Sequence, residues 1–268
     1  MRLKIVWLAA ALLSASFSTP PPAYAACATE YLGGAAPRMT IALTNVRELC
    51  FDAFAVGHSA ASRTPLWSAE HLTARDVTAA RALDRRDSFH AEPQLPSGER
   101  AVLADYTRSG YDRGHMAPNG DMPTREAQAQ SFSLANIAPQ SPTLNRGLWS
   151  EVEENVRDMA LTDGDVFVVT GPIFDNTSSL LRGRVRVPGA VFKAVYDPHT
   201  GVAAAYVADN TPGERYRVVS IAALRQLTGV DPFPTLSESV KRRSGFLPPP
   251  GRWQVASTER RPPLSFDR

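Results

Sequence analysis

The sequence predicts an α+β fold in which a central antiparallel sheet is flanked by helices. Three observations support this prediction: short apolar runs joined by turn signals, one long amphipathic helical pattern in the middle of the chain, and a buried strand pattern that ends at Gly-Pro. The chain of 268 residues is 43% hydrophobic, which suffices to bury a core. Because no internal repeat or clear linker interrupts it, residues 26–268 are expected to form a single domain.

The first 25 residues predict a secretory signal peptide. Arg2 and Lys4 precede an apolar run over residues 5–13, and small residues at 23 and 25 fit a signal-peptidase site. A membrane anchor is disfavoured, because the run is shorter than the roughly 20 residues that span a bilayer. A lipoprotein anchor at Cys27 lacks the usual aliphatic residue before it. We therefore expect an exported protein, periplasmic or secreted, with no membrane attachment once the signal is removed.

Two cysteines, Cys27 and Cys50, remain after removal of the signal. In an exported protein such a pair usually forms a disulfide. This bond would tie the mature N-terminus to the first strand. Neither cysteine lies in a sequence context typical of a nucleophile.

The charge of the mature chain is balanced. Without Arg2 and Lys4, the 29 basic and 27 acidic residues of the chain leave no net charge. Binding of a polyanion would therefore depend on local clusters. The basic clusters are Arg81/Arg85/Arg86, Arg182/Arg184/Arg186 and Lys241/Arg242/Arg243, and a solvated face is the commoner explanation for each.

The first half of the mature chain predicts a hairpin, a long loop and a helix, in that order. Apolar residues over 46–56 predict a strand, and 65–72 predicts its partner after a turn. Residues 73–110 are polar and contain prolines, so we expect a long and mostly irregular segment of a kind that is often functional. The stretch 111–119 ends in an Asn-Gly turn signal, and 124–130 predicts a helix.

The strongest helix signal follows Asn145. Its apolar positions are Trp149, Val152, Val156 and Met159. Their spacing places them on one face of a helix. Asn145, as a cap or first residue, would project from the same side, and Glu153 would lie at the edge of that face.

The second half of the chain predicts further strands and a tail. Residues 165–172 predict a buried strand, and 185–196 with 202–208 predict a hairpin closed by an Asp-Pro-containing turn. Residues 220–227 predict a short helix capped by Gly229. From about residue 247 the chain is rich in proline and arginine, and we expect this tail to be draped over the surface or mobile.

Among the five histidines, His115 has the surroundings that best fit chemistry. It lies in Asp112-Arg113-Gly114-His115, close to Asn119, where acidic, basic and amide groups gather around a glycine that permits close backbone approach. The other histidines are His58, His71, His90 and His199, and none of them has such neighbours. Four residues alone would not establish a site.

Three blocks of sequence extend the motif. They cover residues 111–118 (YDRGHMAP), 133–140 (SLANIAPQ) and 144–149 (LNRGLW). In this order and spacing, they resemble the DNA/RNA non-specific endonuclease family, which includes the Serratia-type nuclease and endonuclease G. Weaker similarity covers most of the mature chain. The resemblance implies a ββα-metal (His-Me finger) site on the α+β fold.

The resemblance also implies roles for individual residues. His115 matches the family's general base, and a neutral imidazole is suited to taking a proton from water. Asn145 matches the single direct protein ligand of a Mg²⁺ ion, with Mn²⁺ as an alternative metal. Glu153 matches the residue that holds metal-bound waters. From the residues alone, Asn145 could be an N-cap, and Glu153 could form an i,i+4 pair with Arg157; these local roles are compatible with the metal-site roles.

Arginines in the matching positions would stabilise charge on the phosphate. Arg113 lies within the motif, and Arg86 matches an upstream family arginine, with Arg85 as an adjacent rival. The loop departs from the family pattern at Glu92, where aspartate is commoner. The alignment of this loop with the family can therefore shift by one residue. Supporting positions are Asp112 in the motif, Asn136 as an orienting residue and Arg157 as a basic residue on the helix.

The sequence therefore predicts a metal-dependent endonuclease that hydrolyses phosphodiester bonds of DNA and RNA. It would contact the phosphate backbone and leave 5′-phosphate products. Two alternatives are a family member restricted to single strands or RNA, and a non-catalytic binding protein on the same scaffold. Motifs of serine hydrolases, zinc proteases and P-loop enzymes are absent. Whether the chain forms a homodimer or has an inhibitor protein is left open.

Overall fold

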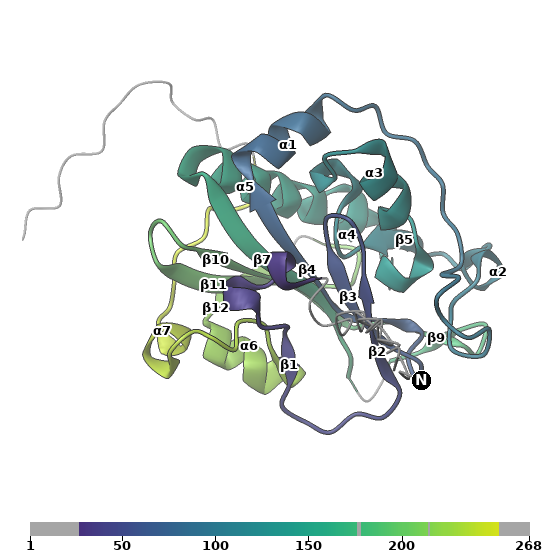
Figure 1. Cartoon of the computed structure of the whole chain (residues 1–268). Coiled ribbons are helices and arrows are strands. Elements are labelled where there is room, and N and C mark those ends of the chain that lie inside the picture. Colours follow the sequence, from purple (N-terminus) through teal and green to yellow (C-terminus); the bar gives the residue numbers. More distant parts are fainter. Residues whose placement is uncertain (1–26, 176–177, 214, 252–268) are drawn as a thin grey trace, which may run out of the picture.

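A computed structural model describes residues 27–175, 178–213 and 215–251 (Figure 1). The predicted signal peptide, 1–25, lies outside these residues. At the centre is a seven-stranded antiparallel sheet with strand order β12-β11-β10-β7-β4-β3-β2. Its strands are β2 (Val46–Cys50), β3 (Ala55–Ser59), β4 (Thr64–Thr73), β7 (Asp165–Ile173), β10 (Ala190–Asp197), β11 (Val202–Asp209) and β12 (Tyr216–Val219).

Three two-stranded pairs and seven α-helices surround this sheet in the described residues. The pairs are β1 (Arg38–Met39) with β13 (Val230–Asp231), β5 (Asp112–His115) with β6 (Ile137–Gln140), and β8 (Leu180–Leu181) with β9 (Val185–Arg186). The helices are α1 (Ala74–Arg81), α2 (Leu103–Tyr106), α3 (Arg125–Ser131), α4 (Pro142–Arg146), α5 (Leu148–Asp163), α6 (Ile221–Thr228) and α7 (Glu238–Arg242). The predicted α+β class, with an antiparallel sheet flanked by helices, is confirmed.

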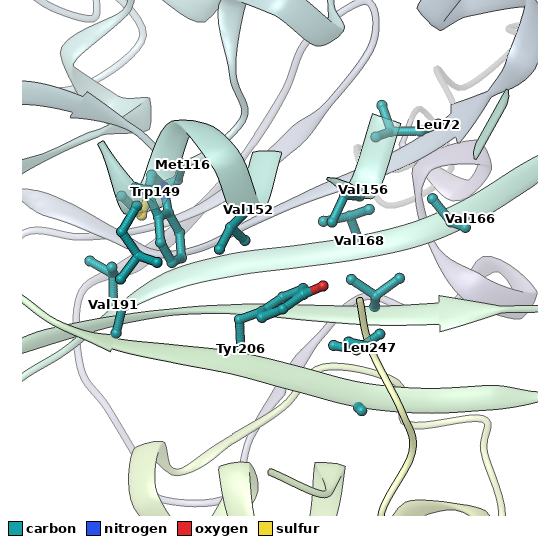
Figure 2. Packing of buried hydrophobic residues seen from close by; sticks show 14 of the residues in the cluster. Leu72, Met116, Trp149, Val152, Val156, Val166, Val168, Val191, Tyr206 and Leu247 are labelled. Carbon is teal, nitrogen blue, oxygen red and sulfur yellow. The ribbon is translucent and has the colours of Figure 1, made fainter. Parts of the chain in front are cut away.

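Helices cover both faces of the central sheet (Figure 1). Alternate residues of a strand point to opposite faces, and both faces of β4, β7, β10 and β11 are buried. On one face, Val168 and Val191 pack with Trp149, Val152 and other residues of α5, as Figure 2 shows. On the other face, a second cluster packs α6 against the sheet. The apolar stripe predicted after Asn145 is therefore the side of α5 that lies on the sheet.

The predicted strand over 46–56 is two strands. A tight turn, closed by a hydrogen bond from Phe51 N to Phe54 O of 2.9 Å, separates β2 from β3. The rings of Phe51 and Phe54 stack with centroids 4.5 Å apart. These two aromatic residues continue the apolar pattern through the turn, and for this reason the pattern looked continuous. The predicted partner strand is β4, which pairs with β3.

The segment 73–110 is less irregular than the sequence suggested. It begins with α1, which Thr73 caps by accepting a hydrogen bond from Asp76 N of 3.1 Å, and it contains the short α2. Only Val77 and Ala80 of α1 are buried, so its charged, solvent-exposed face masked the helical signal. The remaining stretch between the two helices has no regular helix or strand, as predicted.

The hairpin predicted over 185–208 begins later than expected. Val185 and Arg186 belong to β9, and Pro188-Gly189 separates them from β10. Pro cannot donate to a strand ladder, which accounts for the break. The strand over 165–172, the helix over 124–130 and α6 ended by Gly229 are confirmed, and the structure adds that Thr124 is the N-cap of α3.

The tail expected from residue 247 begins as a packed segment. Leu247 is 3% exposed and belongs to the core beneath α5 (Figure 2). Asn155 Nδ2 donates to the carbonyl oxygens of Pro248 and Pro249, at 3.1 and 2.9 Å, and the Tyr206 hydroxyl also donates to Pro248 O. We call residues 247–249 the C-terminal strap. Of the two expectations for the tail, residues 247–249 fit the draped one, because Leu247 and two proline carbonyl groups attach them to the core and to α5. Residues 252–268 lie outside the described part.

The predicted disulfide between Cys27 and Cys50 is present. It joins the start of the described chain to the last residue of β2, an edge strand of the sheet. Of the helices that the structure describes, none is both long and apolar enough to span a bilayer.

Candidate active site

A cavity of about 890 Å³ opens between the β5–β6 hairpin, α4, α5 and the loop that precedes β5. Its walls include the residues Arg85, Phe89, Asp112, Arg113, His115, Asn119, Asn145, Glu153 and Arg157. The cavity thus brings together most of the residues that the sequence singled out. Arg86 and Asn136 do not line it.

The β5–β6 hairpin presents His115 to this cavity. The pairing aligns Asp112 with Gln140 and His115 with Ile137. Gly114 is required because a Cβ there would lie 1.9 Å from Gln140 Oε1, inside the packed side chain. A larger residue would push the two strands apart and move His115.

Asn136 fixes the chain just beyond His115. Its Oδ1 accepts from Ala117 N at 2.9 Å, and its Nδ2 donates to Ala117 O at 2.8 Å. The same side chain bonds to Ser131 O and Ser68 Oγ. Fully buried, Asn136 connects the β5 loop to α3 and β4, so its contacts are those of an orienting residue.

His115 is nearly buried, with 8% of its surface exposed. Its Nε2 has no hydrogen-bond partner among the described residues, while its ring lies against Phe132, with centroids 5.0 Å apart. Burial lowers the pKa of His115 to about 3. The nearby positive charges of Arg85 and Arg113 lower this pKa further, whereas the negative charge of Asp87 raises it. The imidazole is therefore neutral at physiological pH, and Nε2 can accept a proton. The sequence could not show this burial, and therefore could not predict a pKa below the ordinary value of an imidazole.

Two aromatic rings hold two arginines beside His115. The guanidinium of Arg113 lies over Phe89, and that of Arg85 lies over Phe132 at 5.2 Å from the ring centroid. Arg113 is exposed and makes no ion pair within the described part of the chain, whereas Arg85 donates to Asp87 Oδ1 at 2.6 Å. Both cations can approach a phosphate in the cavity.

Arg86, the arginine favoured from sequence, is exposed and stands outside the cavity lining. Its backbone N–H donates to Gln128 Oε1 at 3.2 Å. The adjacent rival, Arg85, occupies the cavity wall instead. Neighbouring residues of an irregular loop can face different directions, so the sequence could not separate the two.

Asn145 lies in the last turn of α4, and Gly147 is the residue at the N-cap position of α5. The interpretation of Asn145 as an N-cap is therefore wrong. Its Nδ2 donates to Asp112 Oδ2 at 3.1 Å, and Arg146 makes a bidentate ion pair with the same carboxylate. Burial alone would raise the pKa of Asp112, but the hydrogen bonds from Arg146 and Asn145 lower it. An ionised Asp112 thus holds the amide nitrogen of Asn145 and leaves the amide oxygen for another partner.

Glu153 lies on α5, partly buried in the cavity wall. Burial raises the pKa of Glu153 to about 7. The positive charges of Lys193 and Arg157 lower this pKa, and the negative charge of Asp121 raises it by a smaller amount. The i,i+4 pair with Arg157 is not formed. Arg157 donates instead to Asp121 at 2.7 Å and to Glu154 at 2.8 Å.

These groups suit a weakly held, hydrated divalent ion. The described residues contain no cluster of three or more His, Cys, Asp or Glu side chains that could enclose a metal. An amide oxygen of Asn145, with Glu153 nearby to orient water, fits the preference of Mg²⁺ for oxygen ligands and retained water. The site fits Mg²⁺ better than it fits zinc, which prefers nitrogen and sulfur ligands.

Several residues at the site escaped the sequence analysis. They are Phe89, Phe132, Asp121 and Arg146. An arginine separated by a few residues from an aromatic residue is a weak signal for ring stacking. The partners of Asp121 and Arg146 lie 36 and 34 residues away along the chain, respectively, so no local pattern could have indicated them.

Comparisons with known proteins agree with this geometry. A family model described as DNA/RNA non-specific endonuclease matches residues 35–239. Nuclease C1 of Cunninghamella echinulata var. echinulata is 35% identical over 176 residues, which cover 61% of this chain and 70% of the relative. The mitochondrial nuclease EXOG of Danio rerio is 34% identical over 66% of this chain, and the matched region spans 57% of that relative. A chain in the crystal structure of the EndoG/EndoGI complex superposes with a TM-score of 0.69 at 25% identity, covering 83% of this chain and 96% of that one.

Proposed function

The chain belongs to the DNA/RNA non-specific endonuclease family, and from this premise we propose that it is a metal-dependent endonuclease that hydrolyses phosphodiester bonds in DNA and RNA. The observation that supports this most is the meeting of His115, with its unpartnered Nε2, and Asn145 on the walls of one cavity. The expected products carry 5′-phosphates, since water would attack phosphorus and the 3′-oxygen would depart.

In this proposal His115 is the general base. Its neutral imidazole takes a proton from the attacking water at Nε2. The aromatic contacts with Phe89 and Phe132 restrict the direction of the ring, so the nitrogen is aimed before substrate binds. Orientation of this kind reduces the entropy cost of the reaction.

We further propose Arg113 and Arg85, rather than Arg86, as the cations that face the phosphate. Both guanidinium groups are held by ring contacts on the cavity wall. Positive groups that stand ready where negative charge develops on phosphate oxygens stabilise the transition state.

Asn145 would bind Mg²⁺, or Mn²⁺ in its place, through the amide oxygen, and Glu153 would orient the waters of that ion. When bound, the metal supplies positive charge for the departing oxygen. Asp112 keeps the Asn145 side chain turned for this role through its hydrogen bond to Nδ2.

Export to the periplasm or the medium is the proposed location. The Cys27–Cys50 disulfide supports it, because such bonds persist in oxidising compartments. Contacts with nucleic acid through the phosphate backbone would need no base-reading module.

The experiment that tests this function is a cleavage assay with supercoiled plasmid, single-stranded DNA and RNA as separate substrates. His115→Ala should lower cleavage by about 100- to 10,000-fold with the fold retained, which is the usual contribution of a general base. His199→Ala, in the turn between β10 and β11, is the matched control and should cleave normally. A chelator should abolish activity, and added Mg²⁺ should restore it. Near-normal cleavage by His115→Ala, or activity that survives chelation, would contradict the proposal.

A further inference from the structure

A row of polar residues crosses the sheet face that α5 covers. Ser68 on β4 pairs with Thr170 on β7, and Thr170 pairs with Lys193 on β10. Glu70 is the next residue of β4 on the same face, because side chains of a strand alternate. All four are at most 1% exposed. The rest of this face packs valines and other apolar residues against α5 (Figure 2), so the polar row interrupts an otherwise apolar core.

Lys193 is a buried cation with few partners. Its Nζ donates to Thr170 Oγ1 at 2.8 Å and lies 6.0 Å from the centroid of the Trp149 ring. No carboxylate lies within ion-pair distance of it in the part of the chain that the structure describes. An ammonium group has three N–H donors, so further donors remain to be satisfied.

Glu70 is the complementary group. It has 0% exposure, and neither carboxylate oxygen has a hydrogen-bond partner among the described residues. The indole Nε1 of Trp149 is also buried without a partner. Unsatisfied donors on Lys193 and Trp149 and unsatisfied acceptors on Glu70 are the groups that a buried water bridges.

The network lies next to the helical turn of α5 that carries Glu153. Trp149 and Glu153 are four residues apart on α5, so they occupy neighbouring positions on one side of the helix. Lys193 lies 6.0 Å from the centroid of the Trp149 ring, so it reaches α5 about one helical turn before Glu153. Its charge also opposes the rise that burial causes in the pKa of Glu70. Burial raises the pKa of Glu70 well above its usual value, which favours the neutral carboxyl. Burying this acid and the ammonium of Lys193 without satisfying their polar atoms is costly, so keeping both beneath one helix serves something other than core stability.

We propose that Glu70 and Lys193 are positioning residues for Glu153, and that together with a buried water and the Trp149 indole they form a polar network that holds the first turns of α5. The network fixes the direction in which Glu153 faces the cavity and the waters of the bound ion. This inference rests on the proposed function, because it assigns a support to the metal site. Neither residue touches substrate, and both act through Glu153.

The test measures metal binding separately from cleavage. Mn²⁺ affinity is determined by electron paramagnetic resonance on the full chain, and thermal unfolding is followed in parallel. Lys193→Met should weaken Mn²⁺ binding about 10- to 100-fold, the usual effect of losing a residue that orients a metal site. The double variant Glu70→Leu with Lys193→Met replaces both buried polar side chains by apolar groups. It should unfold at or above the temperature of Lys193→Met, yet bind Mn²⁺ as weakly.

Two further variants separate positioning from general loosening of α5. Asn155→Ala removes the contacts of α5 with the C-terminal strap, away from the cavity, and should lower the unfolding temperature while leaving Mn²⁺ affinity unchanged. Thr170→Val removes the acceptor of Lys193 but keeps the side-chain shape, and it should weaken Mn²⁺ binding even if the Lys193 variants fail to fold.

The outcomes are distinct from those of the proposed function. A wild-type chain that neither cleaves nucleic acid nor binds Mn²⁺ would refute the proposed function. If the wild type does both, and the double variant and Thr170→Val bind Mn²⁺ with wild-type affinity, then Glu70 and Lys193 are only structural and the inference is wrong. A high-resolution crystal structure should show an ordered water between Glu70, Lys193 and Trp149; a dry contact there would also overturn the network.

Discussion

The guanidinium carbon of Arg113 lies 4.0 Å from the centroid of the Phe89 ring, close enough for a cation–π contact. Phe89 meets Phe132 edge to face at 4.7 Å, and both rings contact His115. One aromatic pair thus fixes the proposed base and, through Arg113 and Arg85, two cations beside it. The arrangement depends on Phe89 in a loop, Arg113 in β5 and Phe132 directly after α3.

Phe89→Leu should lower the rate of cleavage. Loss of the ring removes a cation–π contact worth about 0.5–2 kcal/mol, which corresponds to roughly a 2- to 30-fold decrease in kcat. Because Phe89 is only partly buried, the variant should fold. Phe89→Trp keeps a ring for Arg113 and should retain most of the activity. Equal rates for the leucine variant and the wild type, measured at saturating substrate, would show that the ring does not position Arg113.

Arg85→Ala and Arg86→Ala are matched variants of neighbouring residues. Only Arg85 lines the cavity, so its loss should decrease kcat/KM by about 10- to 1,000-fold, as for other groups that stabilise developing charge. Arg86→Ala should stay within a few-fold of the wild type in the same steady-state assay. The reverse order of effects would restore Arg86 as the upstream arginine.

Asp112→Ala should weaken metal binding about 10- to 100-fold, because the Asn145 amide then loses the carboxylate that orients it. The control is Arg146→Ala, which removes the other partner of Asp112 but leaves the bond to Asn145 in place. Arg146 is 72% exposed, so its loss should have little effect on stability. Calorimetric titration with Mg²⁺ measures both variants; equal affinities would contradict the orienting role of Asp112.

His58 should make the fold sensitive to acid. Burial lowers the pKa of His58 to about 4. The negative charge of Glu99 raises this pKa, and the positive charge of Arg47 lowers it. The unfolded chain binds a proton below about pH 6.5 that the folded chain does not bind until about pH 4, so stability decreases as the pH falls through this window. The linked loss is about 3 kcal/mol at pH 4.

Urea unfolding of His58→Leu at a series of pH values tests this prediction. The difference in unfolding free energy between pH 7 and pH 4 should be smaller in the variant than in the wild type by about that amount. His199→Leu, a turn residue, should leave the pH dependence unchanged. A parallel pH dependence in His58→Leu and the wild type would show that His58 is protonated equally in both states.

The parts of the fold that were predictable are those with local patterns. The apolar stripe of α5, the strand over 165–172 and the Gly229 cap each depend on residues a few positions apart. The errors have the opposite cause. The turn between β2 and β3 is hidden by two stacked phenylalanines, and the charged face of α1 obscured a helix that has two buried residues.

The candidate site also contains residues that could be predicted from sequence and residues that could not. His115, Asn145 and Glu153 carry motif signals and meet in one cavity. The choice between Arg85 and Arg86 depends on which of two adjacent side chains reaches a distant phenylalanine, which a sequence pattern cannot encode. The role of Lys193 could not be predicted from sequence, because its partner Thr170 lies on another strand.

The C-terminal strap also has a consequence for the time at which the enzyme matures. Asn155 is synthesised roughly ninety residues before the strap that it binds, a delay of about 5–20 s at 5–20 residues per second. Until then Asn155 and Tyr206 lack their carbonyl partners, and the core beneath α5 lacks Leu247. A nascent chain therefore carries every residue of the cavity before the core beneath α5 is complete, so α5 gains this part of its stability only after the strap has been made.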